Sequence, residues 1–546
     1  MALKSTVARE TARFLASRGI KRVYGIPGGE VTHLIDALEL EGIEFVLTHH
    51  ETFAAHMADA EAQLAGRPAV CLSTVGPGAT NIVNGIANSF LDRTPILALM
   101  GEFNDADRAE WTHMNVDLLE LFRPVSKLVE RMYAGNCRDL LERAWDTATA
   151  PLPGPVCIAL SSSDAQAELE ETNWPTSQPA EERQAAPAPQ GDVLRERLSK
   201  AESPAMIVGI GARDPDISRA TAELATAWDI PIVITPKAKG WITSEHPQLA
   251  GVYASYGSAA LQSLLTEADL IVGVGLDGTD FIRPWRYGEV LNLTDRERHD
   301  PSFPAETLIA DVAATLRDAA VDAAVDGAPG GNGAARAAEC RQSARDNIEG
   351  RPEPDLPPPP QSRGGIQPHA AIGAIRGAVG RNTVLVSDVG MLKLALCQYW
   401  DVFEPNTFLV SNGLSTMAYG LPGAIGASYH VGDQPVVALV GDGGLLMCLG
   451  ELDTLARTGR RVVVLVAVDT TLALIRLKAE GDDLGAGSND FGSPDFIAIA
   501  AGVGMNAVRA VSETDLSAKV TECLAFPGPS LIEFFLDYRG YRRMGG

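Results

Sequence analysis

The sequence predicts an α/β protein of three domains, each with a parallel β-sheet flanked by helices. Its 546 residues are too many for one compact core, so several domains of ordinary size are expected. Short apolar runs alternate with helical patterns along the chain, which is typical of parallel sheets. Two stretches of softer composition divide the chain, and we therefore expect domains over residues 1–165, 190–327 and 365–546.

Short apolar runs mark the expected strands. Because these runs are apolar throughout, the strands should be buried on both faces by helices. In such sheets ligands bind beyond the carboxyl ends of the strands, so the loops that follow the strands are where we look for chemistry. The expected strands cover residues 22–24, 44–47, 69–73, 96–100, 156–159, 205–209, 232–235, 270–274, 383–387, 436–440, 462–468 and 530–535.

The regions between the expected domains read as linkers. Residues 162–192 are rich in Ala, Glu, Gln and Pro, and residues 327–365 include a run of four prolines, a composition that favours extended, solvated chain. The first nineteen residues favour an amphipathic helix over a signal peptide. No apolar run approaches the roughly 20 residues that span a bilayer. We expect a cytoplasmic protein.

Composition excludes several classes of function. A hydrophobic content of 46% with 21% charged residues is globular. The formal net charge of -25 repels phosphate backbones and anionic lipid, so neither nucleic acid nor membrane is an expected partner. The seven cysteines are scattered without a CxxC pair, which argues against a zinc module and a secreted disulfide scaffold.

A glycine turn with an acidic residue follows the expected strand 436–440. It reads GDGG at 441–444 and leads into a helical pattern over residues 445–457. Glycines let backbone N–H groups approach phosphate oxygens, and the helix N-terminus is electropositive. Asp469 follows the next expected strand, so it and Asp442 should lie side by side and, with a backbone carbonyl, suit Mg²⁺. Alone, the motif is equally compatible with a plain tight turn.

A GDG turn followed 27 residues later by a second polar ligand resembles the metal–diphosphate motif of thiamine-diphosphate (ThDP) enzymes. The resemblance implies a ThDP- and Mg²⁺-binding site with Asp442, Asp469 and Thr471 as metal ligands. The family typically has asparagine at the second position. Asp469 keeps an oxygen ligand but adds a negative charge, so this site should hold its metal differently.

Further motifs resemble the acetolactate synthase branch of that superfamily. They read GIPGGE at 25–30, HE at 50–51, GPGATN at 76–81 and NGLSTMAYGLP at 412–422, in the family's order and across most of the chain. The resemblance implies the ThDP-binding fold, with a pyrimidine, a middle and a diphosphate domain in that order. In the family, one cofactor is shared by two subunits, which implies a homodimer or homotetramer with active sites at the subunit interface.

Glu51 matches the carboxyl group that activates the cofactor. ThDP reacts through a carbanion at its thiazolium ring, and a carboxyl group that shares a proton with the aminopyrimidine ring helps that carbanion to form. Burial of Glu51 would keep a proton available for this hydrogen bond. From the helical pattern at residues 48–60 alone, a solvated helix face would be the expectation; the motif favours the catalytic role.

The remaining cofactor contacts follow from the resemblance position by position. Met417 matches the residue that wedges beneath the cofactor and keeps its two rings bent, although ordinary core packing would suit it equally. The implied cofactor contacts are Pro27, Asn81, Gly390, Met391, Leu392, Ser415, Met417, Gly441, Asp442, Gly443, Gly444, Asp469, Thr471 and Leu472.

Substrate contacts are implied at three positions. His113 and Met114 stand where synthase relatives carry a Phe-Gln pair, and His113 is also a catalytic candidate, although a lone histidine is usually structural or on the surface. Ile475 matches a substrate-pocket position. Arg476 and Lys478, close by, suit a carboxylate or phosphate, or else a solvated helix face.

Two apparent motifs, one for a dinucleotide and one for zinc, are weaker evidence for a binding site than those above. GVGLDG at 273–278 fits the GxGxxG pattern, but no helix opens cleanly after it, so NAD is not expected. Residues 275–284 replace the flavin-contacting stretch of some synthases, so FAD is not expected either, and this region resembles the flavin-free carboxyethylarginine synthases. His50 and His56 form an HExxxxH pattern in which the two rings would not share a helix face, which argues against a zinc site.

The first hypothesis is a carboligase that decarboxylates a 2-oxo acid such as pyruvate and transfers the resulting enamine to an acceptor. The second is a simple 2-oxo acid decarboxylase that releases an aldehyde. The third is a non-catalytic homologue, which the unusual Asp469 keeps open.

Overall fold

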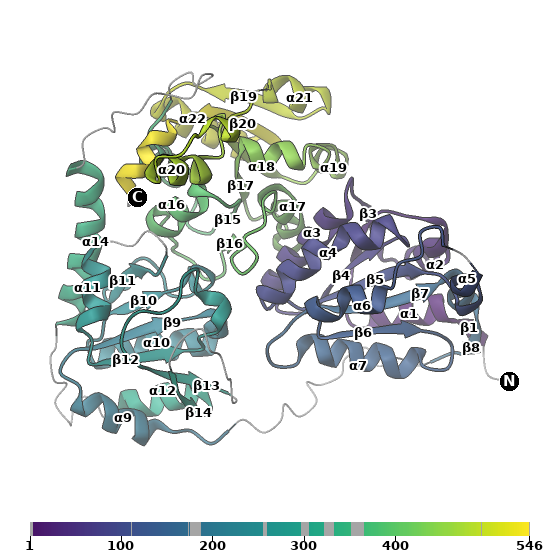
Figure 1. Ribbon diagram of the computed structural model, residues 1–546, viewed down its shortest axis with the longest axis horizontal. Helices are drawn as coiled ribbons and strands as arrows, with labels where there is room; N and C mark the ends of the chain where they lie inside the picture. Colours follow the sequence, from purple (N-terminus) through teal and green to yellow (C-terminus); the bar gives the residue numbers. More distant parts are fainter. Residues whose placement is uncertain are drawn as a thin grey trace.

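The computed structural model describes residues 4–110, 112–172, 174, 187–254, 259–295, 305–321, 332–350, 365–492 and 494–544. Within them, three six-stranded sheets with parallel strand pairs form the centres of three domains (Figure 1). This confirms the predicted fold class. Parts of both predicted linkers, including the run of four prolines, lie outside the described residues. Residues 333–350 of the second form a helix with Ala337 and Cys340 buried, so the expectation of extended, solvated chain is wrong there. No described helix is long and apolar enough to cross a bilayer.

The N-terminal sheet has the strand order β3-β2-β4-β5-β7-β6. A separate antiparallel pair, β1 with β8, joins the two ends of this domain. The strands are β1 (Lys4–Thr6), β2 (Arg22–Gly25), β3 (Glu44–Leu47), β4 (Ala69–Ser73), β5 (Ile96–Glu102), β6 (Leu128–Met132), β7 (Val156–Ser161) and β8 (Glu168–Glu170). The helices are α1 (Val7–Ser17), α2 (Thr32–Leu40), α3 (Glu51–Ala65), α4 (Pro77–Leu91), α5 (Asp105–Glu110), α6 (Leu118–Phe122), α7 (Cys137–Thr149) and α8 (Ser162–Gln166).

The middle sheet has the order β11-β10-β9-β12-β13-β14. Its strands are β9 (Pro204–Val208), β10 (Ile232–Ile234), β11 (Leu249–Val252), β12 (Leu270–Val274), β13 (Val290–Thr294) and β14 (Ala305–Ile309). The helices are α9 (Gly191–Lys200), α10 (Pro215–Ala227), α11 (Ala259–Glu267), α12 (Val312–Val321) and α14 (Gly333–Gly350).

The C-terminal sheet has the order β16-β15-β17-β18-β20-β19. Its strands are β15 (Val384–Ser387), β16 (Phe408–Val410), β17 (Val436–Gly441), β18 (Val462–Val468), β19 (Asn506–Ala510) and β20 (Ser530–Phe535). The helices are α15 (Pro368–Ala378), α16 (Met391–Tyr399), α17 (Gly420–Val431), α18 (Asp442–Met447), α19 (Glu451–Thr458), α20 (Ala473–Gly481), α21 (Phe496–Gly502) and α22 (Glu513–Ala525).

The predicted strands are confirmed, with shifts of one or two residues at some ends. The helix expected within the first nineteen residues is confirmed over Val7–Ser17, whereas Lys4–Thr6 form the strand β1. The single helix expected over residues 445–457 is wrong, because the chain breaks into α18 and α19 around Cys448. The break lets α19 start against the N-terminal domain, where Glu451 accepts a hydrogen bond from His49 N at 2.9 Å.

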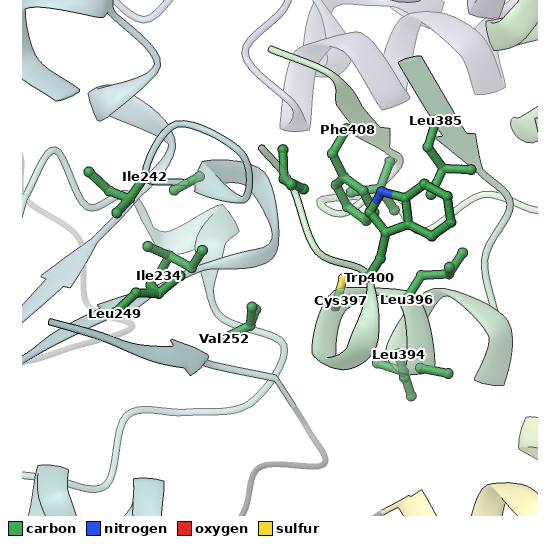
Figure 2. Packing of buried hydrophobic residues seen from close by; sticks show 14 of the residues in the cluster. Ile234, Ile242, Leu249, Val252, Leu385, Leu394, Leu396, Cys397, Trp400 and Phe408 are labelled. Atoms are coloured by element: carbon green, nitrogen blue, oxygen red, sulfur yellow. The ribbon is translucent and has the colours of Figure 1, made fainter. Parts of the chain in front are cut away.

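The domains share continuous apolar cores. Helix α3 lies against α17 so closely that a Cβ on Gly426 would stand 2.0 Å from the carbonyl oxygen of Met57, and one buried cluster joins the N- and C-terminal domains here. A second cluster joins the middle and C-terminal domains. Figure 2 shows Ile234 and Ile242 on the middle-domain side of this cluster, and Trp400 and Phe408 on the other.

A buried polar junction ties all three domains together at Asp92, which follows α4. Lys237 of the middle domain donates to Asp92 Oδ2 at 3.1 Å, and both side chains are almost fully buried. Gly413 N of the C-terminal domain donates to Asp92 Oδ1 at 2.7 Å. The carboxylate therefore has hydrogen-bond donors from two other domains, which fixes α4 relative to both.

Candidate functional site

Glu51 is the first residue of α3, which follows β3 after a short turn. The side chain of His50 caps the helix by accepting from Thr52 N. Glu51 is only 6% exposed, so the solvated helix face that its sequence pattern alone suggested is wrong. Asn81 Nδ2, from the first turns of α4, donates to Glu51 Oε2 at 3.0 Å. Two motifs that are 30 residues apart thus meet in one hydrogen bond.

Small residues bring the neighbouring turns close to Glu51. A Cβ on Gly78 would lie 3.0 Å from Glu51 Oε1 and 2.8 Å from Thr74 Cγ2, so only glycine leaves room there. A Cβ on Gly28 would lie 1.9 Å from Thr74 Oγ1. Thr74, just after β4, therefore lies between the GPGATN turn and the loop that carries Pro27. The side chain of Pro27 is exposed.

The loop between α5 and α6 brings Met114 to the same turn. Met114 has a left-handed backbone (φ 60°), and a Cβ on Gly76 would lie 2.7 Å from Met114 Cβ. Gly76 itself has φ 63° at the N-terminus of α4. His113 is exposed beside Met114. The predicted substrate pair therefore lies on the rim of the turn that contacts Glu51.

Asp442 and Asp469 meet at the carboxyl ends of two paired strands. β17 runs directly into α18 with Gly441 as its N-terminal cap, and β17 pairs with β18 as far as Gly441 and Ala467. Asp442 is 2% exposed, and its carboxylate accepts from Gly443 N and Thr470 N, each at 2.9 Å. The register of the two strands thus places both acidic residues together.

The electrostatics of this pair suit a hard cation. Burial raises the pKa of Asp442, and burial together with the charge of Asp442 raises the pKa of Asp469. A divalent cation between the two would remove this repulsion, and carboxylate and carbonyl oxygens are the ligands that Mg²⁺ takes. The Thr471 hydroxyl donates to the Asn489 carbonyl at 3.2 Å, so Thr471 would offer its backbone carbonyl. Among the described residues there is no cluster of three His, Cys, Asp or Glu side chains that could hold a metal.

A further acidic residue, Asp388, lies behind the turn at 441–444. It follows β15, is buried, and accepts from Val389 N at 2.8 Å and from Ala418 N at 3.2 Å. Burial raises the pKa of Asp388 to about 7. A Cβ on Gly444 would stand 2.0 Å from Asp388 Oδ2. The turn at 441–444 is thus packed on a carboxylate that also holds the loop carrying Met417.

The predicted loop at Gly390, Met391 and Leu392 begins α16. Gly390 has φ 80° and caps the helix, and Met391 and Leu392 are buried. Because Asp388 lies two residues before Gly390 and packs against Gly444, it connects the two segments that are expected to bind the diphosphate. Ser415 is exposed and Met417 half-buried.

On α20, the two cationic candidates differ in burial, and Lys478 is exposed. Ile475 is 50% exposed and Leu472 caps the helix. Arg476, however, is buried and donates to Asp490 at 2.5 Å and to Glu480 at 2.9 Å. Because Arg476 is buried and paired with these carboxylates, the solvated-face interpretation of Arg476 is wrong.

In the middle domain, the GVGLDG turn is filled by the chain itself. The Asp280 carboxylate accepts from Ile210 N and Asp277 N, each at 3.0 Å, and from Thr235 Oγ1 at 2.7 Å. A short 3₁₀ helix, η5 (Gly278–Asp280), follows the turn in place of an α-helix. The donors that would face a dinucleotide phosphate therefore serve an internal carboxylate.

His56, the second histidine of the HExxxxH pattern, lies in α3 and is fully buried. Its ring lies edge-on to Tyr419 with the ring centroids 5.4 Å apart, and burial lowers its pKa to about 3.

Sequence reasoning missed Thr74, Asp388 and Lys393. Thr74 and Asp388 carry the signal that identified Asp442, since each directly follows a parallel strand. Lys393 lies in α16, where it donates to the Ser415 hydroxyl at 2.8 Å, and its pattern in the helix offers no such signal.

Comparisons with known proteins show which family this chain resembles. Three families match in the order of the domains: the N-terminal TPP binding domain of thiamine pyrophosphate enzymes at residues 5–121, their central domain at 192–318 and their C-terminal TPP binding domain at 388–534. The probable acetolactate synthase large subunit of Methanocaldococcus jannaschii is 28% identical, over 97% of this chain and 92% of the relative. The acetolactate synthase isozyme 1 large subunit of Escherichia coli is 29% identical, over 97% and 94%, and the Bacillus subtilis acetolactate synthase is 27% identical, over 96% and 92%. Among solved structures, the Rhodococcus jostii RHA1 thiamine diphosphate-dependent 4-hydroxybenzoylformate decarboxylase has a TM-score of 0.81 at 22% identity, over 98% of this chain and 99% of that one, a likeness of fold.

Proposed function

The chain belongs to the thiamine-diphosphate-dependent enzymes and is acetolactate synthase-like, and on that premise we propose that it is a Mg²⁺-dependent carboligase. It decarboxylates a 2-oxo acid such as pyruvate and transfers the remaining unit to a second carbonyl acceptor. The observation that carries the proposal is the likeness to acetolactate synthases along almost the whole chain. When bound, ThDP supplies the nucleophilic carbon that adds to the 2-oxo acid and stabilises the charge left by departing CO₂.

Glu51 holds a proton against the aminopyrimidine ring. Because Asn81 donates to Oε2, the proton of the carboxyl group belongs on Oε1, which faces Gly78. Asn81 thereby fixes both the direction of the carboxyl group and the oxygen that donates. The absence of a side chain at Gly78 leaves room for this oxygen to reach the ring.

On the other half of the site, Asp442 and Asp469 hold Mg²⁺ together with the carbonyl of Thr471. The backbone N–H groups of the glycine turn at the start of α18 bind the diphosphate. Two carboxylates in place of a carboxylate and an amide make this metal site more negative than is usual in the family.

The two halves are completed by a second copy of the chain. Apolar side chains around the diphosphate half are unusually exposed, namely Met447 at 58%, Ile475 at 50% and Leu484 at 63%. Asn81 is exposed although it bonds the buried Glu51. Such a surface fits an interface that is buried in a homodimer or homotetramer.

Mixing inactive subunits tests this arrangement. Glu51→Gln and Asp442→Asn should each abolish turnover. If one site uses Glu51 of one subunit and Asp442 of the other, random remixing gives half mixed dimers with one intact site each, and about a quarter of the wild-type activity returns. If both residues of a site come from one chain, a mixed dimer contains no intact site and no activity returns.

Product analysis tests the reaction itself. Purified protein with ThDP and Mg²⁺ is offered a panel of 2-oxo acids, alone and with aldehyde or 2-oxo acid acceptors. A carboligase releases CO₂ and forms acetolactate, acetoin or a mixed hydroxyketone, whereas a simple decarboxylase releases the free aldehyde. If no member of the panel yields CO₂ above the Glu51→Gln control, both catalytic hypotheses fail and the non-catalytic one stands.

A further inference from the structure

Lys393 is a buried cation beside the predicted cofactor site. It lies in α16, just after the loop at Gly390, and is 3% exposed. Its Nζ donates to Ser411 O at 3.1 Å, Asn412 Oδ1 at 3.2 Å and Ser415 Oγ at 2.8 Å. All three acceptors are uncharged oxygens of one loop. A buried lysine is costly, and here all three donors of its ammonium group are used to hold that loop.

The loop held by Lys393 is residues 411–418, called the Met417 loop below. It contains two non-glycine residues in the left-handed region, Ser415 with φ 51° and Ala418 with φ 66°. Such conformations are unfavourable and persist only where the surroundings impose them. Lys393 bonds Ser415 directly, and Asp388 accepts from Ala418 N at 3.2 Å, so each strained residue has its own anchor.

Both anchors come from the same short segment of chain. Asp388 and Lys393 flank Gly390, Met391 and Leu392, the expected diphosphate-binding loop. The segment from 388 to 393 therefore fixes the Met417 loop at two points, on either side of the three residues that are expected to bind the diphosphate. Displacing the Met417 loop would change the distance between the part of the site that holds the diphosphate and the part that shapes the rings.

We propose that Lys393 is a positioning residue. It holds the Met417 loop in the position in which Met417 supports the reactive geometry of the cofactor. The consequence for reactivity rests on the proposed function, whereas the effect on the loop does not. Lys239 offers a matched control, because it is a lysine of the middle domain that is also buried, with its Nζ over the Phe408 ring at 5.5 Å.

Hydrogen–deuterium exchange of backbone amides in the cofactor-free protein tests the first step. Lys393→Met removes the ammonium group but keeps an apolar stem in place. Amides of the Met417 loop, including Thr416 N, which donates to Ser411 Oγ at 3.0 Å, should exchange about tenfold faster, while those of α3 stay unchanged. Unchanged protection of the loop, or an equal loss in Lys239→Met, would overturn the proposal.

Exchange of the thiazolium C2 proton of bound ThDP tests the consequence. At saturating ThDP and Mg²⁺, Lys393→Met should slow this exchange by about 10- to 100-fold, as expected for a misplacement near 1 Å. Lys393→Gln, which keeps an N–H donor, should recover part of the loss, and Lys239→Met should exchange like the wild type.

The two failures are distinguishable. Wild-type protein that shows no C2 exchange refutes the proposed function, and the amide measurement then still decides the role of Lys393. If the wild type exchanges its C2 proton normally, two results refute the positioning role alone. One is a C2 exchange rate in Lys393→Met within threefold of the wild type, and the other is a rate in Lys393→Gln no faster than in Lys393→Met.

Discussion

Gly444→Ala is the sharpest test of the turn at 441–444, which is expected to bind the diphosphate. Gly444 lies within α18, where the backbone conformation is open to alanine. Its added Cβ, however, would stand 2.0 Å from Asp388 Oδ2, well inside the roughly 3.5 Å at which non-bonded atoms attract. Since the turn and the carboxylate cannot both stay, one of them must move by about 1 Å or more.

The size of the effect follows from what Asp388 holds. If its carboxylate moves, the hydrogen bond from Ala418 N at 3.2 Å is lost or strained. Loss of one partner of a buried polar group costs about 1–3 kcal/mol. Because the native arrangement must be restored to bind the cofactor, the affinity for ThDP with Mg²⁺ should fall by about 5- to 150-fold.

Calorimetric titration of ThDP at saturating Mg²⁺ measures this affinity. Gly373→Ala is the control for folding, because it lies in α15 with open space where a Cβ would be. Gly441→Ala is the second comparison: its φ of -76° and ψ of 153° suit alanine and nothing of the chain lies within 4 Å, so a loss there reports contact with the ligand. The reasoning is refuted if Gly444→Ala binds ThDP within about twofold of the wild type.

Three further predictions concern single side chains. Glu51→Gln should keep ThDP affinity but slow C2 proton exchange by about 10²- to 10⁴-fold, measured by proton NMR; an unchanged rate would remove Glu51 from its assigned role. Asp469→Asn should weaken Mn²⁺ binding, followed by electron paramagnetic resonance without ThDP, by about tenfold because one negative charge leaves the site, and tighter binding would contradict that account. Lys237→Met leaves the buried Asp92 without its cation and should lower the unfolding free energy by about 3–5 kcal/mol, seen as a lower urea midpoint, whereas the exposed Lys200→Met should leave the midpoint unchanged.

Charged residues hid two edge strands from the sequence, although the edge strand β3 was predicted and the buried interior strand β13 was not. The strands at the centre of each sheet, such as β4, β17 and β18, are buried on both faces and read as continuous apolar runs. Edge strands such as β6 (LVERM) and β19 (NAVRA) carry charged residues because one side of an edge meets solvent. Their apolar run is therefore interrupted, and nothing in the sequence distinguishes them from the ends of helices.

The site divides along a similar line. A residue that directly follows a parallel strand can be located from the sequence, because the carboxyl ends of such strands share one edge of the sheet. This argument brought Asp442 and Asp469 together, and applied consistently it would have found Asp388 as well. This argument does not identify the hydrogen-bond partner of each residue. The bond between Glu51 and Asn81 depends on how α3 and α4 pack. The bond between Arg476 and Asp490 depends on the path of the chain after α20.

Lys393 shows where such reasoning ends and what replaces it. A lysine in a helix is expected at the surface, so the sequence offers no reason to single it out. In the folded chain it is surrounded by uncharged oxygens of a strained loop, and the strain itself indicates a function, because left-handed serine and alanine residues need an anchor. Asp388 supplies one anchor and Lys393 the other, on either side of the loop expected to bind diphosphate. If that loop were held only by general packing, removing the buried ammonium of Lys239 should loosen it as much as removing that of Lys393.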